Sequence, residues 1–103
     1  MPITDTLKVL ANEGRLQMLQ WLKSPHAHFT SAEFSAEAIN AEGGVCVQAV
    51  VIKSGLAQSV VSAYLNSLKQ AGLLTMKREG KWTYYRYDAN AAAQFLSQLQ
   101  QVL

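Results

Sequence analysis

The chain has 103 residues, of which 50% are hydrophobic and 16% are charged. This length predicts a single domain, residues 1–103, with a core of its own. No apolar run approaches the roughly 20 residues of a membrane span. The start, MPITDTLKVLANEGR, lacks a signal-peptide pattern, so we expect a cytoplasmic protein with no membrane partner. The low charged fraction favours a second subunit that covers apolar surface.

The charges are segregated along the chain. Residues 1–52 contain three basic and five acidic residues, whereas residues 53–87 contain six basic residues and one acidic residue. A local excess of positive charge favours a polyanion as partner. A solvated basic face without a partner is the alternative, and charge alone does not separate the two.

The first quarter of the chain predicts two helices. Apolar residues at helical spacing indicate a short helix over residues 4–11, and Asn12 is a plausible N-cap for a second helix. Pro25 should end that helix, because the residue before a proline avoids the α region. Residues 26–44 have no clean period. We expect an ordered excursion there that packs Phe29 and Phe34, with a helical turn around residues 35–40. This excursion either shapes a small-molecule pocket or only packs on the core.

The rest of the chain predicts a short strand, three helices and a hairpin. The expected elements are a strand over 45–47, helices over 48–54 and 58–71, β-like runs over 73–78 and 81–87, and a last helix from Asp88 to Leu103. Gly55 suits a tight turn with positive φ, and Gly72 suits a helix stop. Glu79-Gly80 lies between the two β-like runs, as is typical of a hairpin.

The helix over 58–71 has two contrasting faces. Its core-facing stripe consists of Val61, Tyr64, Leu65 and Leu68. The opposite face is small, polar and uncharged, and consists of Gln58, Ser59, Ser62, Ala63 and Asn66. Such residues can enter a major groove and hydrogen-bond base edges, whereas ordinary exposed helix faces favour Glu, Lys and Arg. An ordinary amphipathic surface helix is the alternative.

The hairpin carries a basic cluster. Lys77, Arg78 and Lys81 are expected together at its tip, where they can contact phosphates or a minor groove. Lys53 and Lys69 can assist at the DNA backbone. Each face of the second strand carries aromatic residues, and one set should pack on the helix over 58–71, although stacking on single-stranded bases is an alternative role.

Two blocks of the chain resemble the ArsR-type winged helix-turn-helix regulators. LKVLANEGRLQMLQWL is similar to the first two helices of that family, and VCVQAVVIKSGLAQSVVSAYLNSLKQAGLLTMKREGKWTYYRY is similar to its helix-turn-helix and wing. WLKSPHAHF, GVCV and GKWTYYR look like a subgroup with a longer connection before the helix-turn-helix. The resemblance implies a mainly α fold of about five helices, with the helix-turn-helix at about 48–71 and a hairpin wing at about 73–87.

The resemblance also implies a symmetric homodimer and a repressor that an effector releases from DNA. Dimerisation would use residues 3–11 and 89–103, whose apolar residues are Ile3, Leu7, Leu10, Phe95, Leu96, Leu99 and Val102. A dimer of this kind should bind double-stranded DNA at an inverted repeat. The effector is an unidentified small molecule or a chemical change.

The sensing residues depart from the family pattern. Many members bind metal through a Cys-X-Cys pair, but here Gln48 follows Cys46 at the second position. The last helix has no histidine and no acid beyond Asp88, so we predict no metal and no cofactor. Ala57 and Val60 stand where the family commonly has Ser and Thr, which removes one helix cap and one phosphate contact.

Three weaker hypotheses remain beside the repressor. His26 and His28 could bind a metal weakly with Cys46, although ordinary loop histidines are favoured. Cys46 could act as a redox switch, but its apolar neighbours favour a buried structural thiol. A winged-helix module that binds an acidic protein is the third. No nucleophile with a base and no phosphate loop stands out, so we expect no enzyme.

Overall fold

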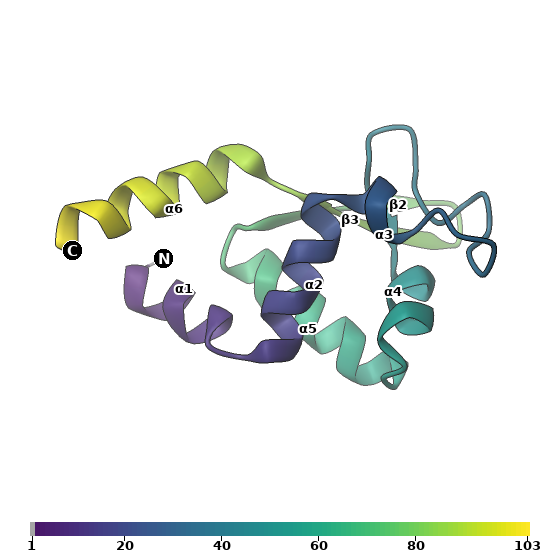
Figure 1. The fold of residues 1–103 in the computed structure, drawn as a ribbon, viewed down its shortest axis with the longest axis horizontal. Helices are drawn as coiled ribbons and strands as arrows, with labels where there is room; N and C mark the ends of the chain where they lie inside the picture. The colour runs from purple at the N-terminus through teal and green to yellow at the C-terminus, as the bar shows by residue number, and fades with distance from the viewer. Residues whose placement is uncertain (1) are drawn as a thin grey trace.

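The structure is a computed structural model that describes residues 2–103 (Figure 1). Within these residues the structure has six helices and a small three-stranded sheet, in the order α1 (Ile3–Leu10), α2 (Glu13–Lys23), α3 (Pro25–His28), β1 (Val45–Cys46), α4 (Val47–Ser54), α5 (Gln58–Gln70), β2 (Leu74–Glu79), β3 (Trp82–Tyr87) and α6 (Ala89–Val102). The sheet is antiparallel, with strand order β1-β3-β2. The predicted mainly α fold with a hairpin wing is confirmed, with the one-turn helix α3 as an addition. None of the described helices has the length and apolar character needed to cross a membrane.

Local signals set most element boundaries. The Asn12 side chain accepts a hydrogen bond from the Arg15 N–H at 2.9 Å, and the Asp88 carboxylate accepts one from the Ala91 N–H at 3.0 Å. Both residues therefore cap the helices that they were predicted to cap. Gly55 and Gly72 adopt φ values of +70° and +83° at the ends of α4 and α5, where a residue with a Cβ would be strained.

The excursion between α3 and β1 contains no helix, and the helical turn expected around residues 35–40 is reduced to a single hydrogen-bonded turn, in which the Ser35 carbonyl accepts from the Ala38 N–H at 3.1 Å. Ile39 instead forms a single β-bridge with Val45, and the Ala38 carbonyl accepts a hydrogen bond from the Cys46 N–H at 2.9 Å. These pairings need an extended backbone at residues 38–39, which excludes a helix. Pro25 does follow the end of α2, but it also begins α3 as that helix's first residue.

The hairpin turn lies one residue later than expected. Glu79 pairs with Trp82 across the two strands, so Gly80 and Lys81 form a two-residue loop. Gly80 has a φ of +60°. Glycine with positive φ at the first position of such a loop is typical of a type II′ turn, whose twist matches that of the strands.

One hydrophobic core joins α2, α4, α5 and the sheet. Its largest fully buried side chains are Phe29, Met18, Leu22, Leu65, Leu68, Val45, Val50 and Val61. Phe29 makes edge-on contacts with Trp21 and Phe34, at ring-centroid distances of 6.3 and 5.4 Å. The excursion therefore packs both of its phenylalanines, as predicted.

The terminal helices lie apart from this core. Figure 1 shows α1 and α6 side by side at one end of the molecule, together with both chain termini, while the wing and α4 occupy the other end. Helix α6 has no buried residue, and the buried residue of α1 is Thr6. The two ends of the molecule are therefore packed very differently.

Candidate nucleic-acid interface

The buried stripe of α5 sets which face of the helix is exposed. Val61, Leu65 and Leu68 are fully buried, and Tyr64 is half-buried beneath the Arg15 guanidinium, 5.5 Å from its ring centre. A Cβ placed on Gly14 would lie 2.7 Å from the Tyr64 ring, so glycine allows α2 to approach α5 closely. These contacts fix the rotation of α5 about its own axis.

The opposite face of α5 is open to solvent. Gln58, Ser59, Ala63 and Asn66 are exposed, and Ser62 is half-buried. Within residues 2–103 the structure records no hydrogen bond from the four polar side chains of this face. Their donors and acceptors are therefore free for a ligand, and no charged residue interrupts the face before Lys69. This arrangement can hydrogen-bond base edges.

The N-terminus of α5 has no side-chain cap. Ala57 occupies the N-cap position, and its carbonyl accepts from the N–H groups of Val60 and Val61 at 3.0 and 3.1 Å. The N–H groups of Gln58 and Ser59 remain at the open end of the helix. Such groups point out of a helix N-terminus and suit a phosphate oxygen.

Lys77 does not belong to the basic cluster that was predicted at the hairpin tip. Cross-strand pairing sets Lys77 opposite Tyr84 and Arg78 opposite Thr83, so the two cations lie on opposite faces of the sheet. The Lys77 ammonium lies 2.9 Å from a Glu42 carboxylate oxygen and 3.6 Å from Glu79. The hydrogen bond that the Lys77 ammonium donates to Glu42, together with the negative charge of Glu42, raises the pKa of Lys77.

Arg78 and Lys81 remain as the cations of the tip. Neither has a carboxylate within ion-pair distance among the described residues. Arg78 donates from Nε to the Gly80 carbonyl at 3.3 Å, and the Lys81 ammonium lies 5.4 Å above the centre of the Trp82 ring. Both side chains are exposed. Their charges are available to a phosphate.

Lys53 and Lys69, the two lysines predicted to assist at the DNA backbone, differ in their contacts within the chain. Lys53, in the last turn of α4, is half-buried, with its ammonium 5.5 Å above the centre of the Trp21 ring. Lys69, in the last turn of α5, is also half-buried. Lys53 therefore has an intramolecular partner, which the sequence did not indicate.

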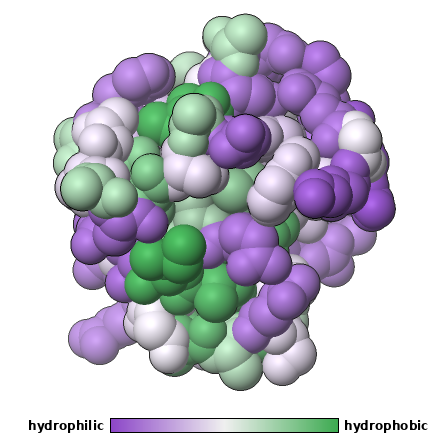
Figure 2. Space-filling model, turned by 90° about the vertical axis from the view of Figure 1, so that its right-hand side faces the viewer, coloured by the Kyte–Doolittle hydropathy of each residue, from purple (hydrophilic) through white to green (hydrophobic). Residues whose placement is uncertain are grey.

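A groove of about 820 Å³ lies between α4, the first turns of α5, the wing and the excursion. Gln58 and Ser62 form part of its wall, so it borders the predicted base-facing residues. Lys81, another predicted site residue, also lines it, whereas most of the remaining lining residues, among them Phe34, Ile52 and Met76, were not predicted as site residues. The strand alternation that places Met76 and Tyr85 on one face of the hairpin could have indicated the wing side. Figure 2 shows this end of the molecule, where apolar side chains gather near the middle and hydrophilic ones surround them.

The candidate sensing residues are dispersed. Cys46 is a free thiol with 3% of its surface exposed, which confirms the prediction of a buried cysteine. His26 is exposed on α3 and His28 is half-buried. Residues 2–103 contain no group of three or more His, Cys, Asp or Glu arranged to hold a metal ion.

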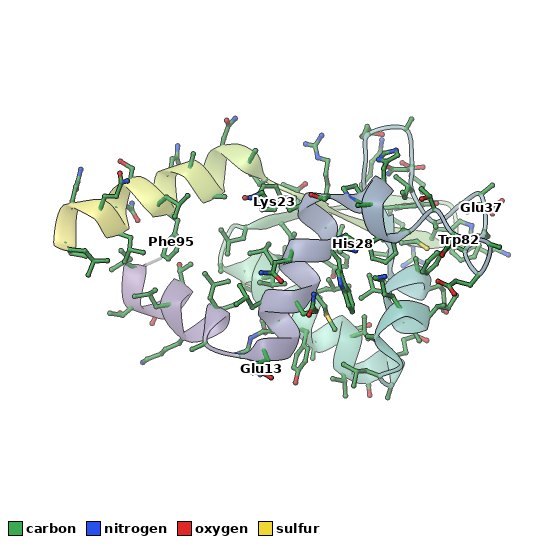
Figure 3. All side chains as sticks on the ribbon, viewed as in Figure 1. Glu13, Lys23, His28, Glu37, Trp82 and Phe95 are labelled. Atoms are coloured by element: carbon green, nitrogen blue, oxygen red, sulfur yellow. The ribbon has the colours of Figure 1, made fainter. Side chains whose placement is uncertain are left out.

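The apolar residues predicted for dimerisation lie on α1 and α6. Leu7, Leu96 and Val102 expose 39%, 57% and 68% of their surface, and Ile3, Leu10, Phe95 and Leu99 are half-buried. Figure 3 shows Phe95 directed from α6 toward α1, far from Trp82 at the wing end. An apolar face of α6 remains uncovered in the single chain.

The known proteins to which the chain is similar are transcriptional regulators. No protein-family model matches the chain. The chain is 44% identical over 88 residues to YbzH, an uncharacterised HTH-type transcriptional regulator of Bacillus subtilis, and the match covers 84% of each chain. A homodimeric winged helix-turn-helix DNA-binding domain from Mycobacterium bovis, a possible ArsR-family regulator, is 31% identical with a TM-score of 0.65, over 97% of this chain and 76% of that one. A possible transcriptional regulator for arsenical resistance has a TM-score of 0.70 over 95% of this chain and 83% of that one; its 24% identity supports the fold alone.

Proposed function

Because the chain belongs to the ArsR family of DNA-binding winged helix-turn-helix transcriptional regulators, we propose that it is a cytoplasmic homodimeric repressor. The dimer binds an inverted-repeat operator in double-stranded DNA and leaves it when an effector binds. The observation that carries the proposal is the open, uncharged polar face of α5 beside the cationic tip of the wing.

The α5 face supplies base recognition in this proposal. Gln58 and Asn66 carry amides, which can bond adenine in bidentate fashion, and Ser59 and Ser62 carry hydroxyls that bond several partners. Ala63 offers a methyl group for contact with a thymine methyl. Because the buried stripe fixes the rotation of α5, these side chains enter the major groove together.

The wing supplies backbone contacts that do not depend on sequence. Arg78 and Lys81 reach phosphates or the adjoining minor groove, and the open N–H groups at the start of α5 reach another phosphate. Lys69 can add a contact at the other end of the helix. Lys53 and Lys77 contribute less, because each already has a partner within the chain.

Dimerisation supplies the symmetry of the operator. The uncovered apolar residues of α1 and α6 support a partner subunit, since burial of each large side chain stabilises association. The Mycobacterium bovis neighbour, which is homodimeric, supports the same arrangement. Two copies of α5 would then meet half-sites spaced by about one helical turn or a multiple of it.

Selection of binding sites from random double-stranded DNA tests the proposal. We expect an inverted repeat to be enriched, and fluorescence anisotropy to show that its affinity falls steeply with salt. A duplex with a single half-site should bind more weakly than the full repeat. Failure to enrich any sequence at low salt would contradict the proposal and favour a module that binds an acidic protein.

A further inference from the structure

We infer that the groove between α5 and the wing is the effector site, and that the effector is a flat aromatic molecule with hydrogen-bonding substituents and no net charge. The inference rests on the proposed repressor function, because it assigns the ligand of that repressor. The groove measures about 820 Å³, within the range of small-molecule sites.

The groove is formed before any ligand arrives, because the excursion is bound to the sheet behind it. The Tyr84 hydroxyl donates to the Glu37 carbonyl at 2.7 Å, and the Asn40 amide donates to a Glu79 carboxylate oxygen at 3.0 Å. Burial raises the pKa of Tyr84, so this hydroxyl keeps its proton at neutral pH. Small-molecule sites are commonly preformed in this way.

The lining of the groove selects the ligand class. Its aromatic walls are Phe34 from the excursion and Trp82 and Tyr85 from β3, which suits a flat ring that packs edge-on or stacked. The floor includes the buried side chains of Ala38, Cys46 and Ala49. These small side chains leave room for a ring.

The polar groups of the groove favour an uncharged ligand. Gln48 and Thr83 provide a side-chain amide and a hydroxyl, which can pair with carbonyl, phenol or amide groups of a ligand. Glu33 and Lys81 are the charged residues of the lining, one of each sign. A ligand with net charge would be attracted by one of them and repelled by the other.

Overlap with the DNA-binding face couples the two ligands. Gln58 and Ser62 belong both to the groove wall and to the proposed base-facing surface. A molecule that contacts them in the groove competes for the same hydrogen-bonding groups that DNA needs. The operator must weaken effector binding by the same factor by which the effector weakens operator binding. A DNA strand in the groove is the alternative occupant.

The test uses the full chain and Nile red, an uncharged flat aromatic dye with a carbonyl acceptor, whose emission rises in apolar surroundings. Ser35→Phe adds a ring to the groove lining at an exposed excursion residue. Ala32→Phe adds the same ring at an exposed excursion residue outside the groove and is the matched control. Because both residues are exposed, thermal melts should show both variants folded like the original chain.

We expect Ser35→Phe to weaken dye binding by about tenfold or more, and Ala32→Phe to leave it nearly unchanged. The dye should release the selected operator from the original chain and from Ala32→Phe, but not from Ser35→Phe. Equal dye affinity in the two variants, or simultaneous binding of dye and operator, would overturn the inference. So would loss of operator binding in Ser35→Phe, since the groove would then belong to DNA.

These results separate the two proposals. If the original chain binds no DNA sequence, the repressor proposal fails, and the dye affinities of the two variants still decide whether the groove takes an aromatic ligand. If it binds DNA but the dye affinities are equal, the repressor proposal stands and the groove assignment fails.

Discussion

The wing end and the terminal end of the molecule differ in how completely they bury their apolar side chains. At the wing end, α5 buries Val61, Leu65 and Leu68 completely against residues of the same chain. At the terminal end, the 14 residues of α6 include no buried side chain, and Leu96 exposes 57% of its surface. A helix that buries its apolar stripe is stabilised within the chain, whereas one that leaves it uncovered depends on association. Substitutions at the two ends should therefore affect different measurements.

Arg15 joins the two ends. Its side chain donates to the carbonyls of Val9 and Lys8 in the last turn of α1, at 2.7 and 3.4 Å, and its guanidinium covers the Tyr64 ring of α5. A rearrangement of the terminal helices would therefore reach α5, the helix that we propose binds DNA, through one side chain. The contrast between the ends is one of packing and does not make them independent.

The largest effect is expected in the core of the wing end. Leu65→Ala should lower the free energy of unfolding by about 2–5 kcal/mol, because it removes a fully buried side chain and leaves a cavity. Chemical denaturation at fixed protein concentration measures this change. Asn66→Ala, at the exposed neighbouring position, should change the free energy of unfolding by less than about 0.5 kcal/mol. Similar losses in both variants would remove the distinction between the two faces of α5.

At the terminal end, the expected effect is on association. Leu96→Asp should weaken dimerisation by about 2 kcal/mol or more, roughly 30-fold, because it places a charge on the apolar face of α6. Sedimentation equilibrium measures the dimer dissociation constant. Gln98→Asp adds the same charge at an exposed position of α6 outside the apolar set. An unchanged constant in Leu96→Asp would show that α6 does not form the dimer.

A smaller effect is expected for base recognition. Gln58→Ala should reduce discrimination by about 1–3 kcal/mol at one base pair of each half-site, because it removes an amide from the open face of α5. Competition between duplexes that differ at that base pair measures the change. Gln70→Ala, at the far end of the same helix, is the control. If base preference is unchanged in Gln58→Ala, another residue makes the base contact in the major groove.

The smallest effect is expected for the wing charges. Replacing Arg78 and Lys81 by glutamine should reduce the slope of log affinity against log salt by about 0.9 for each phosphate that the wing no longer neutralises. Lys77→Gln should change the slope less, because Lys77 is already paired with Glu42. Anisotropy titrations over a range of salt concentrations measure the slopes. A change for Lys77→Gln as large as half of that for the double variant would show that the Lys77–Glu42 ion pair opens on DNA.

Much of the wing end could be predicted from sequence. The spacing of the α5 stripe identified its buried face, and Gly72 and Asp88 marked the neighbouring boundaries. The partner of Lys77 could not be predicted, since Glu42 lies 35 positions earlier, in a segment without periodicity. The lining of the groove could not be predicted for the same reason, because Phe34, Met76 and Gln58 come together only when separate segments of the chain pack.

The sequence by itself determined the five longer helices, the hairpin and the polar face of α5, because each follows from spacing or from one residue acting on its near neighbours. The tertiary structure decided the free cations of the wing, the extended course of residues 38–39 and the presence of a groove beside the polar face of α5. These depend on which distant segments lie against each other, and that is set by the packing of the whole core. The apolar face of α6 needed both kinds of information. The spacing of its apolar residues is visible in the sequence, whereas their exposure is visible only in the tertiary structure.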